Sequence, residues 1–244
     1  MVRGAEHGLE HDPMKKYAHL FFDLDHTLWD FETNSRATLR ELHAAERLLE
    51  RGVPDAAEFI DAYEEVNQGL WRRYESGHID RHVLRVLRFR NTLLRFGVKD
   101  DALADRMGRE YLALTPKRTT LMQGARELLT DLGGQYRIHI ITNGFHEVQE
   151  EKVACSGLAE HIDLLLSSEM AGAKKPDPRI FRAALQRTKA RADESLMIGD
   201  SVAADIAGAR AAGWDQAHFA PNGGGDDQAT YVLQRLDDLR GILL

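Results

Sequence analysis

The sequence predicts an α/β protein whose core is a doubly wound (Rossmann-like) parallel sheet, with an all-helical cap inserted after the first strand. Two observations support this prediction. From Thr119 onward, short apolar runs alternate with helical segments, as they do in consecutive βαβ units. Between Asn34 and Thr119, in contrast, apolar residues recur at helical spacing and no convincing strand is present. The helical block therefore interrupts the sheet pattern once, and the chain then rejoins it.

The first strand is expected over about Tyr17 to Asp23, where an apolar run ends in carboxylates. A run that is apolar on both faces is typical of a strand buried in a parallel sheet. Because residues i and i+2 of a strand point to the same side, Asp23 and Asp25 are expected to project together. Ligands of such sheets bind beyond the carboxyl ends of the strands, where this pair would lie. Residues 29–34 should follow as a turn.

Four helices are predicted in the inserted block. The first begins at a polar capping residue, Asn34 or Ser35, and Gly52 and Pro54 end it. The expected ranges are about 35–51, 55–75, 80–96 and 101–114. The domains we expect are a disordered tail over 1–13, a catalytic core formed by 14–33 and 119–244, and a helical cap over 34–118. Met14 is an alternative to Met1 as the native start.

The alternating part of the chain predicts three further strands and four helices. The strands are expected at about 136–142, 195–198 and 216–220, and the helices at about 122–132, 145–155, 178–188 and 203–212. Glycines follow several of these helices, as is common where a helix ends. Residues 231–244 should form a brief extended piece and a terminal helix.

The composition limits the function classes. The 244 residues carry a formal net charge of -7, which gives no indication of binding to a nucleic acid polymer. A single cysteine, Cys155, excludes an internal disulfide, fits a reducing cytoplasm and is expected to serve packing. No apolar run is long enough to cross a bilayer, and the first residues do not resemble a signal peptide. We therefore expect a cytoplasmic protein without a membrane partner, whose oligomeric state stays open.

Polar residues cluster where the predicted core segments end. The four segments are Asp23-Leu24-Asp25-His26-Thr27, Thr142-Asn143-Gly144, Lys175-Pro176-Asp177, and Gly199-Asp200 with Asp205 five residues on. Two carboxylates about 4 Å apart repel by roughly 4 kcal/mol at an effective dielectric constant of about 20, so a cluster of them requires a cation. Oxygen ligands favour Mg²⁺, and the set indicates a site for an oxyanion.

These segments, in this order and with a helical insertion after the first, resemble the haloacid dehalogenase (HAD)-like hydrolase superfamily, subfamily I with a helical C1 cap. The resemblance extends over nearly the whole chain from about Lys15. It implies a Mg²⁺-dependent phosphatase that hydrolyses a small phosphomonoester through an aspartyl-phosphate.

The resemblance also implies roles for the carboxylates. Asp23 corresponds to the nucleophile, and Asp25 to the general acid that protonates the leaving group and then activates water. Asp200 would ligate Mg²⁺ together with Asp23 and the Asp25 carbonyl. Asp205 would support this shell, although a carboxylate in the first turn of a helix could equally complement the helix dipole.

The other motif residues would bind the phosphoryl group or order the loops. Thr142 and the Asn143 amide correspond to the groups that hold the phosphoryl oxygens, with Gly144 completing their segment. Lys175 would neutralise charge on both the nucleophile and the phosphoryl group. We expect the Thr27 hydroxyl to order its loop rather than to contact the substrate.

Residues 28–34 and 141–145 further resemble the branch that contains pyrimidine 5′-nucleotidases acting on noncanonical nucleotides. This implies substrates such as UMP, dUMP or dTMP, whose base could stack on an aromatic ring. The aromatic candidates are Trp29, Phe31, Trp71 and Tyr74, although aromatic residues at helical spacing more often belong to a core. Four arginines, Arg72, Arg73, Arg85 and Arg88, are expected to form a solvated cationic face.

Several other functions use the same residues. A sugar-phosphate or phosphoglycolate-type phosphatase would share the chemistry, and a phosphomutase would return the phosphoryl group to its substrate. A metal-free dehalogenase is disfavoured because it has no use for Asp25. A catalytically silent binding protein is disfavoured because binding alone needs no acid–base carboxylate.

Overall fold

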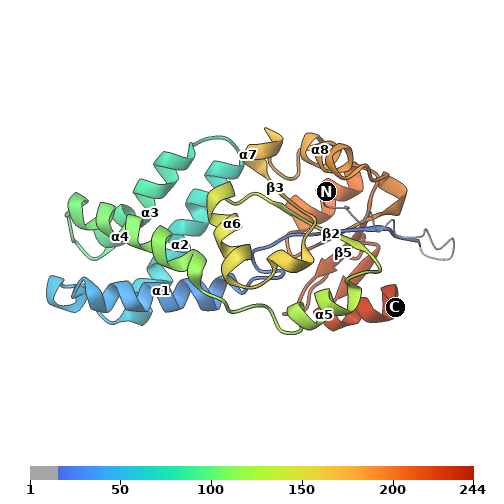
Figure 1. Ribbon diagram of the computed structural model, residues 1–244. Helices are drawn as coiled ribbons and strands as arrows, with labels where there is room; N and C mark the ends of the chain where they lie inside the picture. The colour runs from blue at the N-terminus through green and yellow to red at the C-terminus, as the bar shows by residue number, and fades with distance from the viewer. Residues whose placement is uncertain (1–15) are drawn as a thin grey trace, which may run out of the picture. The chain divides into compact units, whose positions relative to one another are not determined.

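The computed structural model describes residues 16–244, which divide into two compact units (Figure 1). One unit contains the chain up to Asp30 together with Leu121–Leu244, and it holds the sheet. The other unit spans Phe31–Thr120 and is helical. The expected tail over 1–13 and the alternative start at Met14 lie outside the described residues. Within residues 16–244, no helix combines the length and apolar character needed to span a membrane.

A six-stranded parallel sheet forms the centre of the first unit. Its strands lie in the order β3-β2-β1-β4-β5-β6. Their bounds are β1 His19–Phe22, β2 Arg137–Thr142, β3 Leu164–Ser167, β4 Ser195–Gly199, β5 Asp215–Phe219 and β6 Tyr231–Leu233. The predicted α/β class with a parallel, doubly wound sheet is confirmed. The chain reverses its direction of winding at β1, between β2 and β4, which is where such sheets bind ligands.

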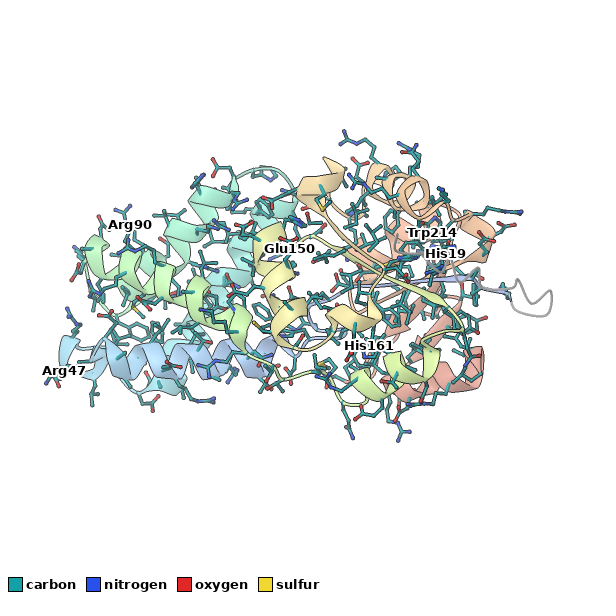
Figure 2. The ribbon with its side chains drawn as sticks, viewed as in Figure 1. His19, Arg47, Arg90, Glu150, His161 and Trp214 are labelled. Carbon is teal, nitrogen blue, oxygen red and sulfur yellow. The ribbon has the colours of Figure 1, made fainter. Side chains whose placement is uncertain are left out.

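Helices cover both faces of this sheet. In Figure 1, α5 (Ala125–Leu132) and α8 (Pro178–Thr188) lie on opposite sides of the strands. On the α8 side lies the indole of Trp214 (Figure 2). Phe21 of β1 packs against it with ring centroids 4.6 Å apart, and Phe181 of α8 meets it edge-on. This apolar packing holds the strands in register and so fixes where their carboxyl ends lie.

The described part of the same unit contains four further helices. The helices are α6 His146–Cys155, α7 Ser168–Ala171, α9 Ala207–Ala211 and α10 Arg240–Leu243, with a π-helical turn over Val202–Ile206 before α9. Turns of 3₁₀ helix occur at Ala159–His161, Ala192–Glu194 and Leu236–Leu239. Cys155, expected to serve packing, is exposed at the end of α6.

The helical unit consists of α1 Phe31–Ala45, α2 Ala56–Glu75, α3 Arg81–Arg95 and α4 Asp101–Leu114, with 3₁₀ turns at Leu48–Arg51 and Thr115–Lys117. Aspartates cap three of these helices: the Asp55, Asp80 and Asp100 carboxylates accept hydrogen bonds from backbone N–H groups in the first turns of α2, α3 and α4. The apolar faces of all four helices meet in one core.

The predicted turn over residues 29–34 is wrong, because α1 already begins at Phe31. Asn34 and Ser35, which were expected to cap the helix, lie inside it with buried side chains. Their polar groups bond across the unit instead. The Asn34 amide donates to the Thr120 carbonyl at 2.8 Å, and the Ser35 hydroxyl lies 2.7 Å from that of Tyr111. Asn34 and Ser35, although of types that often cap helices, therefore make tertiary hydrogen bonds here.

The expected solvated cationic face is wrong for Arg88, which is 4 % exposed. Its guanidinium carbon lies 4.7 Å from the centre of the Tyr111 ring and 5.7 Å from that of Phe89. These cation–π contacts help to offset the cost of removing the charge from water. Arg72 and Arg73 are exposed, as the prediction required.

Candidate active site

The carboxyl ends of three neighbouring strands place the candidate residues at one edge of the sheet. Phe22, the last residue of β1, pairs with Ile140 of β2 and with Ile198 of β4. Asp23 follows Phe22 directly, and its N–H donates to the Ile198 carbonyl at 2.8 Å. Thr142 ends β2, and Asp200 follows the last residue of β4. The parallel register thus brings together segments that are far apart in the sequence.

Three carboxylates cluster at this edge. Asp23, Asp200 and Asp205 each offer an oxygen, and these oxygens lie within 4.8 Å of one another. Burial raises the pKa of Asp23 well above its ordinary value, although the charge of Lys175 opposes this. Burial, together with the charge of Asp205, also raises the pKa of Asp200. Gathering these groups is electrostatically costly unless cations balance them.

Asp205 is held against the end of β4 by a close approach to the backbone. The Ser201 N–H donates to its Oδ2 atom at 3.1 Å. A Cβ atom at Gly199 would lie 2.2 Å from the same oxygen, so a residue with a side chain cannot replace this glycine without displacing the carboxylate. The Thr27 hydroxyl donates to Asp200 Oδ1 at 3.3 Å and so connects the loop after β1 to the cluster.

Lys175 supplies one balancing charge. Its Nζ atom lies 2.5 Å from Asp23 Oδ1 and 2.6 Å from Asp205 Oδ1, and it donates to the Ile141 carbonyl at 2.7 Å. Burial alone would lower the pKa of Lys175, but the charges of Asp205 and Asp23 outweigh it and raise the pKa above its ordinary value. The ammonium is therefore charged.

Asn143 holds the backbone of this lysine. Its side-chain amide donates to the Lys175 carbonyl at 3.0 Å and accepts from the Lys175 N–H at 2.8 Å. The family resemblance implies that the Asn143 amide binds the phosphoryl oxygens. The structure places its side chain in this paired contact with Lys175.

Three carboxylates, of which Asp23 and Asp205 are buried and Asp200 is half-buried, exceed the charge of one lysine. The donors are all hard oxygens within the span that one cation can bridge, so the residues fit a divalent metal ion. This fit follows from the charge and the donor chemistry of the residues themselves.

A family model for haloacid dehalogenase-like hydrolases matches residues 17–213. The chain belongs to this family. The hydrolase YfnB of Bacillus subtilis is 32% identical over 94% of this chain and 97% of its own. A crystal structure of YfnB superposes with a TM-score of 0.84 at 30% identity, covering 94% of this chain and 99% of that one.

Two pyrimidine 5′-nucleotidases are similar to this HAD-like hydrolase over most of its length. PynA of Streptococcus pneumoniae is 32% identical over 91% of this chain and 93% of its own. YjjG of Escherichia coli is 32% identical over 93% of this chain and 98% of its own. The candidate site residues, from Asp23 to Asp205, all lie within the residues that the family model matches.

The Thr142 hydroxyl accepts two hydrogen bonds within the protein. Its Oγ1 atom accepts hydrogen bonds from the Gly144 N–H at 3.0 Å and from Gln149 Nε2 at 2.7 Å. A hydroxyl has two acceptor lone pairs and one proton, so the proton of Thr142 is left to donate. This is the hydrogen bond that a phosphoryl oxygen would accept.

Two residues of α6 that the sequence motifs do not include also contact Asp25. Lys152 Nζ lies 2.6 Å from Asp25 Oδ1, and Gln149 Nε2 donates to Asp25 Oδ2 at 3.0 Å. The available signal was their spacing: three residues apart on a helix, they share one face, and both are buried. Polar residues that share one face of a helix normally indicate solvent exposure, so the spacing alone does not predict that this face is buried.

Trp29, one of the aromatic candidates for base stacking, is not available to stack on a nucleotide base. Its indole is fully buried, and Lys152 Nζ lies 4.4 Å from its ring centre. In the helical unit, Tyr74 is buried while Trp71 is partly exposed, and their rings meet edge-on at 5.4 Å. Trp71 and the partly exposed Phe31 stay candidates for base stacking.

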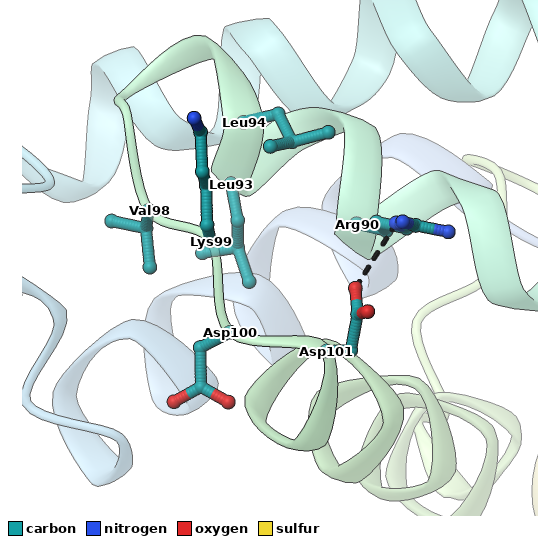
Figure 3. A pocket seen from close by; sticks show the side chains of 7 residues that line it. All are labelled: Arg90, Leu93, Leu94, Val98, Lys99, Asp100 and Asp101. Carbon is teal, nitrogen blue, oxygen red and sulfur yellow. Dashed lines mark ion pairs between the residues drawn. The ribbon is translucent and has the colours of Figure 1, made fainter.

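A separate pocket of about 150 Å³ lies in the helical unit, where α3 turns into α4 (Figure 3). It is lined by Arg90, Leu93, Leu94, Val98, Lys99, Asp100 and Asp101. Arg90 and Asp101 form an ion pair with 3.0 Å between Nε and Oδ1. Asp100 caps α4, so three of the four charged residues in the lining hold the helix ends at this turn.

Proposed function

We propose that the protein is a Mg²⁺-dependent phosphomonoester hydrolase that acts through an aspartyl-phosphate on Asp23, with pyrimidine nucleoside 5′-monophosphates as its substrates. The observation that carries the proposal is the contact of Lys175 with Asp23 inside the carboxylate cluster. A nucleophilic carboxylate must be ionised, and burial opposes this at Asp23. Lys175 and a bound cation would together keep Asp23 charged.

The first half-reaction follows from this arrangement. Asp23 attacks phosphorus, while Lys175 and the Thr142 hydroxyl stabilise the charge on the transferring oxygens. Bound Mg²⁺ would supply further positive charge, and Asp23, Asp200 and Asp205 are the carboxylates that would hold it, together with the Asp25 carbonyl. Asp25 donates a proton to the departing alkoxide.

The second half-reaction releases phosphate. The ionised Asp25 takes a proton from water, and the resulting nucleophile attacks the aspartyl-phosphate on Asp23. Asp25 is suited to both steps because 24% of its side chain is exposed, which leaves room for a leaving group or a water. Residues of α6 bind both oxygens of its carboxylate, so the carboxylate is already oriented before the reaction and loses little conformational entropy in the transition state.

The substrate class is supported by the relatives PynA and YjjG, both named as pyrimidine 5′-nucleotidases. The YfnB structure is described as bound to magnesium and as revealing interdomain movement. We infer by analogy that the helical unit of this chain acts as a cap that closes during turnover and contacts the nucleoside.

The experiment is a panel of UMP, dUMP, dTMP, purine nucleotides, sugar phosphates and phosphoglycolate, each with Mg²⁺ and after removal of metal by EDTA. Acid quenching with labelled substrate should trap phosphate on the wild-type protein and on Asp193→Asn, an exposed control, but not on Asp23→Asn. Full activity without metal would refute the cofactor. A sugar phosphate or phosphoglycolate that outperforms every pyrimidine nucleotide would refute the substrate class and leave the chemistry intact.

A further inference from the structure

Helix α6 buries a polar face. Of its ten residues, Gln149, Lys152 and Val153 are buried, while the neighbouring Glu150 is exposed (Figure 2). A helix in an α/β unit normally turns apolar side chains inward. A glutamine and a lysine in these places cost solvation free energy that bonds within the protein must offset.

Lys152 meets this cost at the Asp25 carboxylate. The lysine is 3% exposed, its Nζ atom lies 2.6 Å from Asp25 Oδ1, and the Trp29 ring covers it from a centre 4.4 Å away. The burial is asymmetric, because 4% of the lysine side chain but 24% of the aspartate side chain is exposed. Lys152 therefore contacts the Asp25 carboxylate on its buried side, and the opposite side of the carboxylate is accessible.

Gln149 binds the other oxygen of the Asp25 carboxylate. Its Nε2 group donates to Asp25 Oδ2 at 3.0 Å and to Thr142 Oγ1 at 2.7 Å. One amide thus sets the distance between the carboxylate and the hydroxyl expected to bind phosphate. Its own Oε1 atom is buried without a hydrogen-bond partner in the described part of the chain. The position of the amide satisfies its N–H donors and leaves its acceptor oxygen unsatisfied.

The glycine at position 144 makes room for this contact. A Cβ atom there would lie 2.3 Å from Gln149 Nε2. The backbone after β2 therefore has the shape that lets the glutamine reach both Asp25 and Thr142.

We propose that Lys152 and Gln149 form a holder that fixes the plane of the Asp25 carboxylate, so that it meets the leaving-group oxygen and later the attacking water in the right orientation. Lys152 is then a positioning residue that acts through Asp25, and this role rests on the proposed function. Each carboxylate oxygen has two lone pairs, so an oxygen with one donor behind it keeps a site for the transferred proton in front.

A merely structural ion pair would behave differently. Removing one partner of such a pair would lower the stability of the protein, and any loss of activity that follows would affect all substrates alike. If Lys152 instead orients the acid–base group, its loss should lower the rate most for substrates whose leaving group must be protonated. Esters of poorly stabilised alkoxides need a proton on the leaving oxygen, whereas p-nitrophenolate departs with little protonation.

The test replaces Lys152 with methionine, which has a similar length and no charge. In Lys152→Met, kcat/KM for a nucleoside 5′-monophosphate should fall about 10- to 100-fold, as is typical when a group that orients a functional residue is removed. The kcat/KM for p-nitrophenyl phosphate should fall by a small fraction of that. The matched control is Lys189→Met, which removes an exposed lysine and should change neither value.

A double-mutant cycle with Asp25→Asn separates the holder from a general effect. If Lys152 acts through Asp25, adding Lys152→Met to Asp25→Asn should cost no further activity on the nucleotide. Equal losses on both substrates, an unchanged nucleotide activity, or fully additive losses in the cycle would each overturn the inference. Should Lys152→Met not fold, Lys152→Gln, which also lacks the charge, is measured in the same cycle.

The same data distinguish failure of the inference from failure of the proposed function. If Asp25→Asn itself lowers both substrates equally, the acid role of Asp25 is refuted, and the holder with it. If Asp25→Asn is selective for the nucleotide but Lys152→Met is not, the inference alone is refuted.

Discussion

Lys175 Nζ and Asp23 Oδ1 lie 2.5 Å apart at the carboxyl end of β1, with 2% and 12% of their side chains exposed. This pair joins two loops that are more than a hundred residues apart in the chain. It lies in a cluster whose remaining groups are carboxylates, so the lysine stabilises the folded site as well as the charge expected to develop during catalysis.

Replacing Lys175 with methionine should impair both activity and stability. We expect kcat to fall by roughly 10²- to 10³-fold, because a preorganised charge at the transferring group is lost. The free energy of unfolding should fall by about 3–5 kcal/mol, since buried carboxylates lose their partner. Steady-state kinetics and urea unfolding measure the two effects. A variant with wild-type stability would show that the cluster is balanced in another way.

Divalent metal should stabilise the protein through the same cluster. At a Mg²⁺ concentration of about 100 Kd, the free energy of unfolding should rise by about 2.7 kcal/mol. Gly199→Ala should abolish this gain, because its Cβ would lie 2.2 Å from Asp205 Oδ2. Thermal unfolding with and without Mg²⁺ provides the measurement. Gly241→Ala is the control, since a Cβ there meets nothing within 4 Å; an equal metal response in both variants would contradict the site.

The convergence of the motifs could be predicted from the sequence because it depends on few physical rules. Asp23, Thr142 and Asp200 each follow an apolar run, and the ends of parallel strands meet at one edge. The alternation of strands and helices after Thr119 was also sufficient to predict the fold class.

The contacts behind the site could not be predicted in this way. Lys152 and Gln149 are of residue types that usually lie on the surface. Their burial depends on a shared partner, Asp25, which is more than a hundred positions away in the chain. Arg88 was misassigned for the same reason, since its partner is an aromatic ring of another helix. Asn34 has the type of a capping residue but bonds to Thr120. The spacing of such polar residues along a helix does not distinguish a buried face from a solvent-exposed one.

The first unit should lose stability in mild acid through a pair of histidines. His139 Nε2 lies 3.0 Å from His19 Nδ1, and burial, together with the charge of His19, lowers the pKa of His139 to about 4. Burial also lowers the pKa of His19. Between about pH 6.5 and pH 4, the unfolded chain binds more protons at His139 than the folded chain does, so stability falls as the pH falls.

The expected loss at His139 is up to about 3 kcal/mol between these two pH values. In His139→Leu, the free energy of unfolding should depend less on pH over this range than in the wild type. The measurement is urea unfolding followed by circular dichroism at several pH values. His82→Gln removes an exposed histidine and should keep the wild-type slope. Identical slopes in wild type and His139→Leu would show that the pair does not titrate on unfolding.

The last prediction concerns the helical unit as the source of substrate preference. If it recognises the base, UMP should exceed AMP in kcat/KM by roughly 10- to 200-fold, the range that one size-dependent contact can supply. Trp71 is one candidate for this contact, because it is partly exposed while Tyr74 beside it is buried. Trp71→Ala should lower the UMP:AMP ratio and leave hydrolysis of p-nitrophenyl phosphate near its wild-type rate, since that substrate has no base to stack. Leu49→Ala removes another exposed apolar side chain of the same unit and serves as the control. A ratio that survives Trp71→Ala would assign base recognition to other residues, whereas a ratio near one in the wild type would refute recognition by the helical unit altogether.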